Sequence, residues 1–197
     1  EADVERLARA AKRDMGGSRY RKTILNRHLP PEVIQSFVLQ RLKNDAELKI
    51  GEFTKAVVTV PAYFNEPRRK STQDAGELAG LEVIDIINEP TAAALAYGVQ
   101  RGFINEKGQA AERERILVYD LGGGTFDVTL MDIDQSRFTA LGTAGDVYLG
   151  GIDWDQRVFD FAKSEITAHH DVDFSADTVL QEKLMTQCVG AKRSLSA

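Results

Sequence analysis

The sequence predicts an α/β protein, and two patterns carry that prediction. From residue 30 to residue 98, short β-branched runs alternate with segments of helical spacing, which is typical of a partly parallel sheet covered by helices. From residue 116 to residue 141, alternating apolar and polar residues are interrupted by short turns, which indicates antiparallel hairpins. The chain is therefore expected to contain two differently built sheets with flanking helices.

The first stretch opens with two expected helices. Residues 3–13 place apolar side chains at helical spacing, and Gly16-Gly17 follows them. A second helix is expected to begin at Pro30-Pro31 and to end at Gly51. Its apolar face is expected to carry Val33, Ile34, Phe37, Val38 and Leu42.

Two strand–helix pairs come next. Residues 56–60 form a short β-branched run and are expected to be a buried strand. The following helix is expected after Asn65, a favourable N-cap residue, with Gly80 just past its end. Residues 83–87 predict another strand, and residues 90–97 predict an alanine-rich helix.

Residues 105–115 are the best candidate for a boundary, because they hold six charges and no large apolar side chain. After them the pattern predicts strands at 116–120, 125–133 and 137–141, then helices at about 153–168 and 176–195. Trp154 and Phe159, on the first of these helices, are expected to lie in the core.

Composition excludes several classes of protein. The net charge of −5 gives no electrostatic support for a nucleic-acid partner. The single cysteine, Cys188, excludes an internal disulfide and fits a reducing compartment. No apolar run approaches the roughly 20 residues of a membrane-spanning helix, and no signal peptide opens the chain. Because the chain begins at Glu1 and ends without a helix-ending signal, we expect both ends to be cut from a longer chain.

Three consecutive glycines, Gly122 to Gly124, lie between two predicted strands. Glycines let the backbone approach a ligand closely and point its N–H groups inward, as a phosphate cradle requires. Since a strand rather than a helix follows them, the Walker loop and the dinucleotide fingerprint are both excluded. Ordinary turn chemistry is the alternative explanation for glycines at this place.

Two carboxylates flank the glycines. If Asp120 pairs with Thr125, then Asp127 lies opposite Val118, and both carboxylates share one face about two residues apart. Such a pair beside a glycine cradle suits a hydrated Mg²⁺ held against phosphates. A second glycine loop, residues 145–153, leads into a helix N-terminus that could attract an anion, or it is a plain loop.

Three longer segments, residues 57–65, 87–98 and 118–128, resemble signatures of the seventy-kilodalton heat-shock (DnaK-like) chaperone family. The resemblance is strong from Pro30 to Asp155 and returns at residues 191–196. It implies an actin-like, ribonuclease-H-like α/β fold with two lobes, both incomplete here, and ATP between them. The expected parts are 1–29 (outer first lobe), 30–111 (inner first lobe), 112–152 (inner second lobe) and 153–197 (helices leading into the outer second lobe).

The resemblance also implies roles for individual residues. Asp120 and Asp127 match the acidic groups around hydrated Mg²⁺, and Thr125 with Gly122, Gly123 and Gly124 matches the phosphate loop. Glu89 matches a glutamate that orients water near the metal; the alternative is a charge that stabilises a helix N-terminus. Lys12 matches a lysine that assists attack at the terminal phosphate; the alternative is a solvated helix charge.

Further residues match those that contact the nucleotide in the family and those that transmit its effect to the rest of the protein. Gly150 and Gly151 match phosphate contacts, and Lys192, Arg193 and Ser196 match adenosine contacts. Pro61 and Arg69 resemble a proline switch and an arginine relay; a turn proline and a surface arginine are the alternative.

Two local features depart from the family pattern or stand outside it. Val189 occupies a position where the family usually carries an acidic residue, so nucleotide binding is expected to be weaker. His169, His170 and Asp171 suggest metal ligation on paper, but adjacent histidines at a helix end are expected to face solvent.

The function that the resemblance implies is that of a cytoplasmic chaperone. ATP and ADP with Mg²⁺ would control how a C-terminal domain, absent from this chain, binds unfolded polypeptides, with a J-domain co-chaperone and a nucleotide exchange factor as partners. No nucleic-acid or membrane partner is expected. The alternatives are an actin-like filament protein, a sugar kinase, or a regulatory homologue with weak ATPase activity. The isolated chain is expected to be inactive, because a first glycine hairpin should precede Glu1 and an adenosine loop should follow Ala197.

Overall fold

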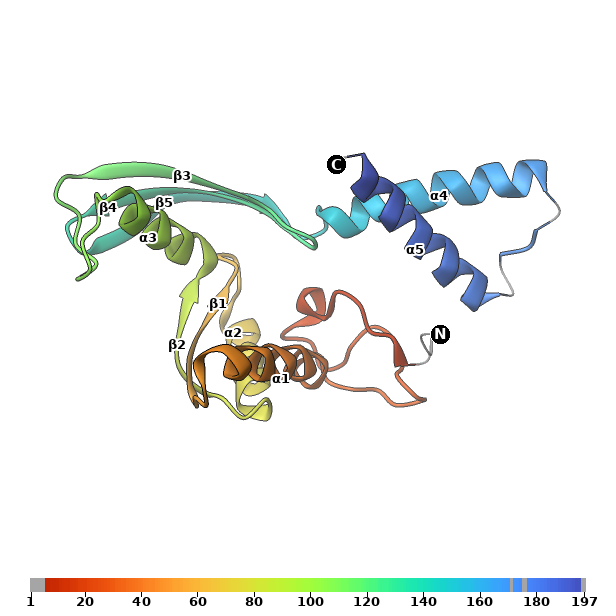
Figure 1. The fold of residues 1–197 in the computed structure, drawn as a ribbon, viewed down its shortest axis with the longest axis horizontal. Helices are drawn as coiled ribbons and strands as arrows, with labels where there is room; N and C mark the ends of the chain where they lie inside the picture. Colours follow the sequence, from red (N-terminus) through yellow and green to blue (C-terminus); the bar gives the residue numbers. More distant parts are fainter. Residues whose placement is uncertain (1–5, 171, 175–176, 196–197) are drawn as a thin grey trace.

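The structure, a computed structural model, describes residues 6–170, 172–174 and 177–195. These residues form two separate sheets, one of two parallel strands and one of three antiparallel strands, with helices around them (Figure 1). The predicted α/β class is therefore confirmed. None of the helices in this part of the chain is long and apolar enough to cross a membrane.

The predicted N-terminal helix is wrong over its described residues. Among the described residues expected there, residues 7–10 are not helical, Arg6 lies in a 3-10 turn, and Ala11–Asp14 form a short 3-10 helix, η2. Ala10 adopts a left-handed conformation with φ 53° immediately before it, which interrupts an α-helix. The Tyr20 hydroxyl accepts from the Arg9 N–H (2.9 Å) and donates to the Arg9 carbonyl (2.8 Å), so a side chain takes the place of helical partners.

The first sheet follows the predicted order of helices and strands. Helix α1 spans Pro31–Ile50, strand β1 Lys55–Val60, helix α2 Glu66–Leu78, strand β2 Glu82–Asn88 and helix α3 Glu89–Arg101. Strands β1 and β2 pair in parallel, as expected from the alternation of strand and helix. Asn65 caps α2 through its side chain, which accepts from the Arg68 N–H.

The expected apolar face of α1 is mostly uncovered. Ile34 is buried, but Phe37, Val38 and Leu42 are 61%, 50% and 59% exposed. Strand β1 likewise buries Val60 while Val57 stays half exposed, so the expectation of a fully buried strand is wrong. Helix α1 instead buries Pro31, Ile34 and Ser36 and packs through Leu39, so the predicted inward face is wrong except at Ile34.

The second sheet consists of β3 (Glu114–Leu121), β4 (Phe126–Asp134) and β5 (Arg137–Asp146), in that order and antiparallel. Its covered face carries Met131 and Ile133, which pack with Ala94 of α3 and with Ile104. Helix α3 therefore touches both sheets, following β2 along the chain and covering β3 and β4.

The predicted register of the β3–β4 hairpin is wrong by two residues. Leu121 pairs with Phe126 and Asp120 pairs with Asp127, because the Gly122 N–H donates to the Thr125 carbonyl (3.0 Å) and closes the turn one residue later than expected. The two carboxylates still share a face, as predicted, but they lie directly opposite each other rather than two residues apart.

Helices α4 (Gly151–His169) and α5 (Thr178–Ser194) pack against each other beside the second sheet (Figure 1). Phe159 is buried as expected, whereas Trp154 is 55% exposed, so its placement in the core is wrong. The two side chains are five residues apart and point about 140° apart on the helix. A helix that packs along one side therefore buries only one of them.

The paired histidines do not form a metal site in the described part of the chain. His169 and His170 are exposed at the end of α4, as expected, and Asp171 lies outside the described residues. No group of three or more potential metal ligands occurs among the residues that the structure describes.

Candidate functional site

The turn between β3 and β4 has all three of its glycine carbonyls engaged. The Gly151 N–H donates to the Gly122 carbonyl (3.0 Å), and the Ile152 N–H donates to the Gly123 carbonyl (2.8 Å). The Gly124 carbonyl accepts from Nε and Nη2 of Arg13, at 2.9 and 2.6 Å. Two carbonyls are thus held by the backbone of α4 and the third by a side chain from η2.

The N–H groups of the same turn point the other way. In a trans peptide the N–H lies opposite the C=O, and the described chain has no cis peptide. The N–H groups of Gly123, Gly124 and Thr125 therefore point away from α4 and Arg13. None of these three N–H groups donates to an acceptor within the described residues. Successive unpaired N–H groups of this kind form an anion-binding concavity.

Neither backbone conformation nor packing explains three glycines in this turn. None of the three has a positive φ, so an L side chain would not strain the backbone. A Cβ at Gly123 would meet nothing within 4 Å, and a Cβ at Gly122 or Gly124 would come no closer than 3.5 Å to its neighbours. The absent side chains therefore serve to keep this face of the turn open.

Asp127 is a buried carboxylate without a partner. Its residue is 5% exposed, and neither carboxylate oxygen has a hydrogen-bond partner among the described residues. Burial raises its pKa above the ordinary value, and the nearby charges of Glu89 and Asp120 raise it further, against the opposing effects of the Lys12 charge and the neighbouring Thr125 hydroxyl, which lies outside hydrogen-bond distance. A buried carboxylate of this kind costs free energy unless a cation compensates it. The site therefore fits a hydrated Mg²⁺, which prefers carboxylate and water oxygens.

Lys12 and Glu89 meet beside these carboxylates. Lys12 Nζ donates to Glu89 Oε1 at 2.7 Å, with both side chains partly buried. Lys12 lies on η2 and Glu89 is the first residue of α3, so the contact joins segments 77 residues apart. Lys12 is consequently not a free, solvated helix charge. Glu89 does occupy a helix N-terminus, as the alternative explanation supposed, and it pairs with a cation there.

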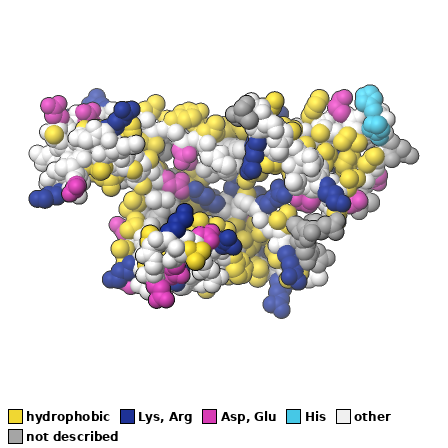
Figure 2. Space-filling view, in the orientation of Figure 1, with side chains coloured by type: hydrophobic (Ala, Val, Ile, Leu, Met, Phe, Trp, Pro, Cys, Tyr) yellow, Lys and Arg dark blue, Asp and Glu magenta, His cyan; other side chains and the backbone are white. Residues whose placement is uncertain are grey.

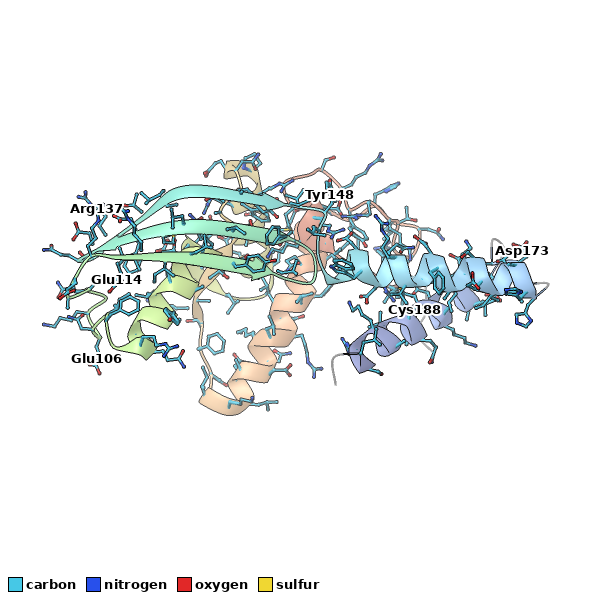
Figure 3. The ribbon with its side chains drawn as sticks, turned by 90° about the horizontal axis from the view of Figure 1, so that it is seen from above. Glu106, Glu114, Arg137, Tyr148, Asp173 and Cys188 are labelled. Atoms are coloured by element: carbon cyan, nitrogen blue, oxygen red, sulfur yellow. The ribbon has the colours of Figure 1, made fainter. Side chains whose placement is uncertain are left out.

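Arg13 is a residue that the sequence reasoning missed. Its side chain is 8% exposed, and besides the Gly124 carbonyl it binds Asp153, with Nη1–Oδ1 at 3.1 Å and Nη2–Oδ2 at 2.5 Å. The hydrogen bond from Arg13 lowers the pKa of Asp153. The guanidinium also lies 5.6 Å from the centre of the Tyr148 ring. Figure 3 places Tyr148 where the second sheet meets α4, above the N-terminal segment.

Tyr63 is the second residue that was missed. Burial raises the pKa of its phenol, with the Asp127 charge as the next cause. Its residue lies in the loop after β1, close enough to Asp127 and to the buried Thr125 for their charge and hydroxyl to affect it. The local sequence around Tyr63 gave no indication that its side chain lies near Asp127 and Thr125.

The start of α4 is bound to the glycine turn rather than left open. Because Gly151 and Ile152 donate to the turn, the expectation that these N–H groups are unpaired is wrong. A Cβ on Gly150 would lie 2.8 Å from the carbonyl carbon of Gly123 and from the nitrogen of Gly124. A Cβ on Gly151 would come no closer than 3.5 Å to any atom. Gly150 therefore permits the close approach of α4 to the turn.

The residues matched to adenosine are only partly brought to this region. Lys192 Nζ donates to the Gly151 carbonyl (2.9 Å) and pairs with Asp155 (2.6 Å). Arg193 is exposed on α5, and Ser196 lies outside the described residues. Val189 is half-buried on the same helix. The structure thus places Lys192, but not Arg193, against the start of α4.

Pro61 lines the same cleft as Lys12 and Glu89, and Arg69 binds the residue before Glu89. Pro61 is fully buried after β1. Arg69 Nε donates to the Phe64 carbonyl (3.0 Å), and its Nη2 donates to Asn88 Oδ1. Asn88 immediately precedes Glu89, so Arg69 joins the loop after β1 to the end of β2. Arg69 is partly buried and hydrogen-bonded rather than a free surface arginine.

Basic side chains gather where the two sheets face each other. Figure 2 shows Lys and Arg side chains along the seam between the second sheet with α4 and the first sheet with α1. A cleft of about 460 Å³ opens next to α1 and β1, and Lys12 and Glu89 line it together with apolar side chains. The polar groups described above therefore converge from η2, α3, the β3–β4 turn and α4.

Comparisons with known proteins identify the family of the chain. A family model described as Hsp70 protein matches residues 2–197. The chain is 45% identical over 193 residues to proteins named "Chaperone protein DnaK" from Thermotoga petrophila and Thermotoga maritima, and 44% identical to the one from Thermotoga neapolitana. Each alignment covers 98% of this chain and 31% of the relative, so the chain spans about a third of the length of these relatives. The α/β arrangement fits the actin-like ATPase fold of this family. The chain belongs to the Hsp70 family.

Proposed function

We propose that this chain is part of the ATP-binding and ATP-hydrolysing domain of a molecular chaperone. One observation carries the proposal: the β3–β4 turn has three engaged carbonyls, three free N–H groups and an open face beside the unpartnered carboxylate of Asp127. Fold alone would not distinguish this function from that of a filament protein or a sugar kinase. Membership of the Hsp70 family favours the chaperone over both.

The turn and its carboxylates would hold the phosphates and the metal. The N–H groups of Gly123, Gly124 and Thr125 bind phosphate oxygens, while Gly122 closes the turn that aims them. Asp120 and Asp127 hold hydrated Mg²⁺ from opposite strands. Bound Mg²⁺ supplies positive charge that neutralises the charge on the transferring phosphoryl group. With the cation present, the free energy cost of the buried Asp127 charge is offset.

Lys12 and Glu89 would act at the terminal phosphate. The ammonium of Lys12 stabilises negative charge there, and the carboxylate of Glu89 accepts a hydrogen bond from the attacking water. Their 2.7 Å contact keeps both groups in place before the ligand arrives. Such preorganised charges act without reorganisation during the reaction, which makes them effective.

The adenosine side is proposed to lie at the start of α4 and the end of α5. Gly150 and Gly151, matched to phosphate contacts by the family resemblance, are proposed to act there by holding the phosphate-binding turn, since the Gly151 N–H is bound to the Gly122 carbonyl. Lys192, Arg193 and Ser196 contact adenosine, where the planar guanidinium of Arg193 stacks on the base. Val189 offers no acceptor for the ribose hydroxyls. A hydrogen bond to a charged group is worth about 1.5–3 kcal/mol, so Val189→Glu should tighten ATP binding by roughly tenfold or more.

The proposal extends to the longer protein that contains this chain. ATP and ADP would alternate in the site and control a C-terminal domain that binds unfolded polypeptides, in the cytoplasm, with a J-domain co-chaperone and a nucleotide exchange factor. Pro61 and Arg69 transmit the state of the site, since Arg69 binds Asn88 next to Glu89. The proposed parts are residues 1–29 and 30–111 for the first lobe, and 112–152 and 153–197 for the second. The 197 residues alone are not expected to turn over ATP.

The proposal is tested by substituting Lys12 in the full-length protein. Lys12→Met should bind Mg·ATP but hydrolyse it roughly 100-fold more slowly, because the charge at the terminal phosphate is lost. Lys70→Met is the matched control, since Lys70 also pairs with a carboxylate, that of Asp74, but is exposed on α2. Single-turnover hydrolysis at saturating Mg·ATP gives the rate. An unchanged rate for Lys12→Met, or a parent protein that does not hydrolyse ATP, would contradict the proposal.

A further inference from the structure

Arg13 carries the longest-range contacts of the site. From η2 it reaches the Gly124 carbonyl, 111 residues away, and Asp153 on α4, 140 residues away. Two of its three nitrogens serve the carbonyl and two serve the carboxylate, with Nη2 shared between them. The guanidinium, whose side chain is 8% exposed, thus binds one backbone carbonyl and one carboxylate.

Only a guanidinium can make this set of contacts. Its planar fork presents donors in two directions, which suits a carboxylate on one side and a carbonyl on the other. A lysine ammonium at the same place is a point charge that could satisfy either acceptor but not both in the same geometry. The contact with the Tyr148 ring covers the face of the guanidinium and favours the same orientation.

The third carbonyl of the turn depends on a different part of the chain from the first two. Gly122 and Gly123 are held by the backbone of α4, which follows β5 directly. Gly124 is held only by Arg13, within the described residues. The peptide that joins Gly124 to Thr125 therefore takes its orientation, with its N–H toward the open face, from a residue on η2.

We infer that Arg13 is a positioning residue that locks the β3–β4 turn in the form that binds phosphate, and that it does so by joining η2 to the turn and to α4. This inference rests on the function proposed above. Lys12, its neighbour on η2, is held against Glu89 at the same time. The segment that carries Lys12 therefore also sets the shape of the phosphate-binding turn, and the two sides of the site are assembled together.

The first arm of the test measures hydrogen exchange in the full-length protein without nucleotide. The amides of Gly122, Gly151 and Ile152 each donate within this cluster. In Arg13→Lys they should exchange about tenfold faster than in the parent, while amides in the interior of α2 keep their rates. A purely structural role would speed exchange in both places. Arg41→Lys is the matched control, because Arg41 pairs with Asp45 on the exposed side of α1.

The second arm measures binding of Mg·ATP, Mg·ADP and adenosine by calorimetry. Because the turn contacts phosphates and not the nucleoside, Arg13→Lys should weaken Mg·ATP about tenfold, weaken Mg·ADP less and leave adenosine unchanged. Asp153→Asn removes the negative charge that pairs with Arg13 but keeps the Gly124 contact. It should therefore weaken Mg·ATP more than Mg·ADP and leave adenosine unchanged, with a smaller loss of affinity than Arg13→Lys. This variant also decides the matter if Arg13→Lys does not fold.

The inference is overturned if the cluster amides exchange at the parent rate in both variants. It is equally overturned if ATP and adenosine lose affinity by the same factor. If the parent binds no Mg·ATP, the proposed function fails, whereas the exchange arm still reports whether Arg13 holds the turn. The two failures are therefore distinguishable.

Discussion

The two ends of β4 carry one buried aspartate each, and they are treated in opposite ways. Near the β4–β5 turn, Asp132 is 7% exposed and accepts hydrogen bonds from Arg113 and Arg115, at 2.9 to 3.2 Å. Near the β3–β4 turn, Asp127 is 5% exposed, and its oxygens have no partner in the described chain. The pKa of Asp132 is lowered by its hydrogen bond to Arg113, and the pKa of Asp127 is raised by burial.

The turns at the two ends of β4 also differ, in their use of glycine. The β4–β5 turn reverses the chain through Gln135 and Ser136 without any glycine, although Gln135 adopts a φ of 51°. The β3–β4 turn contains three glycines, none of which has a positive φ. Figure 3 shows how far apart the two ends lie, with Arg137 at one and Tyr148 at the other. One end satisfies its own groups, whereas the other leaves a buried carboxylate and three N–H groups without partners among the described residues.

The largest expected effect is on ATP hydrolysis, which should depend on the aspartate at one end of β4 and not on the one at the other. Asp127→Asn in the full-length protein should lower ATP hydrolysis by roughly 100- to 1000-fold, because it removes a charge placed for the metal and the phosphates. Asp134→Asn, at the exposed end of the same strand, should leave hydrolysis unchanged. Steady-state rates at saturating Mg·ATP decide the comparison. Wild-type turnover in Asp127→Asn would sink the metal-site assignment.

The next effect tests why α4 lies so close to the glycine turn. Gly150→Ala should destabilise the protein by about 1–3 kcal/mol and weaken Mg·ATP binding, because its Cβ would meet the turn backbone at 2.8 Å. Gly151→Ala should change stability by well under ~1 kcal/mol, since its Cβ has ordinary contact distances. Denaturant unfolding of both variants is the measurement. Equal destabilisation by the two would show that close approach is not the reason for Gly150.

A smaller effect is expected on the free energy of unfolding, and it should have opposite signs for substitutions of Asp127 and Asp132. Asp127→Asn should raise the free energy of unfolding of the nucleotide-free protein at neutral pH by about 1 kcal/mol, because an unpaired buried charge is removed. Asp132→Asn should lower it, because two arginines lose a charged acceptor and one of its two oxygens. Chemical denaturation at pH 7 gives both values. A loss of stability in Asp127→Asn would mean that its carboxylate is satisfied in solution.

The pH dependence follows from the same two pKa shifts. The raised pKa of Asp127 means that the folded state holds this proton more tightly, so its contribution to stability is present at low pH and is lost as pH rises from about 3.8 through the raised value. The lowered pKa of Asp132 contributes stability above its ordinary pKa that is lost as pH falls through the folded value. Removing each aspartate should flatten the corresponding limb of the pH–stability curve.

The smallest effect is expected at the other turn. Gln135→Gly relieves a left-handed conformation but adds freedom to the unfolded chain, so the free energy of unfolding should change by less than ~1 kcal/mol. Binding of Mg·ATP should be unaffected. Calorimetry and denaturation on the same variant check both statements. A loss of ATP affinity would show that this turn belongs to the site after all.

Local signals predicted most of the fold. Asn65, Pro90 and Gly51 mark helix ends through their own backbone and side-chain chemistry, so α1, α2 and α3 could be placed from the sequence. The alternation around Asp127 also predicted that its carboxylate shares a face with Asp120. These features depend on neighbours within one or two turns of the chain, which is why they were predictable.

The missed features depend on distant partners. The hairpin register was displaced because one hydrogen bond, from Gly122 to Thr125, decides where the turn closes. The N-terminal helix failed because Tyr20 takes the backbone groups of Arg9. Arg13 could not be assigned because its partners lie 111 and 140 residues away.

The most direct test of the central claim follows the amides of Gly123, Gly124 and Thr125 during a titration. In the full-length protein labelled with nitrogen-15, Mg·ATP should shift these three resonances strongly, adenosine should not, and Gln135 and Ser136 should stay unchanged with both. This result would show that the glycine turn binds phosphate through its free N–H groups. Resonances that do not move with Mg·ATP, or that move equally with adenosine, would contradict the account.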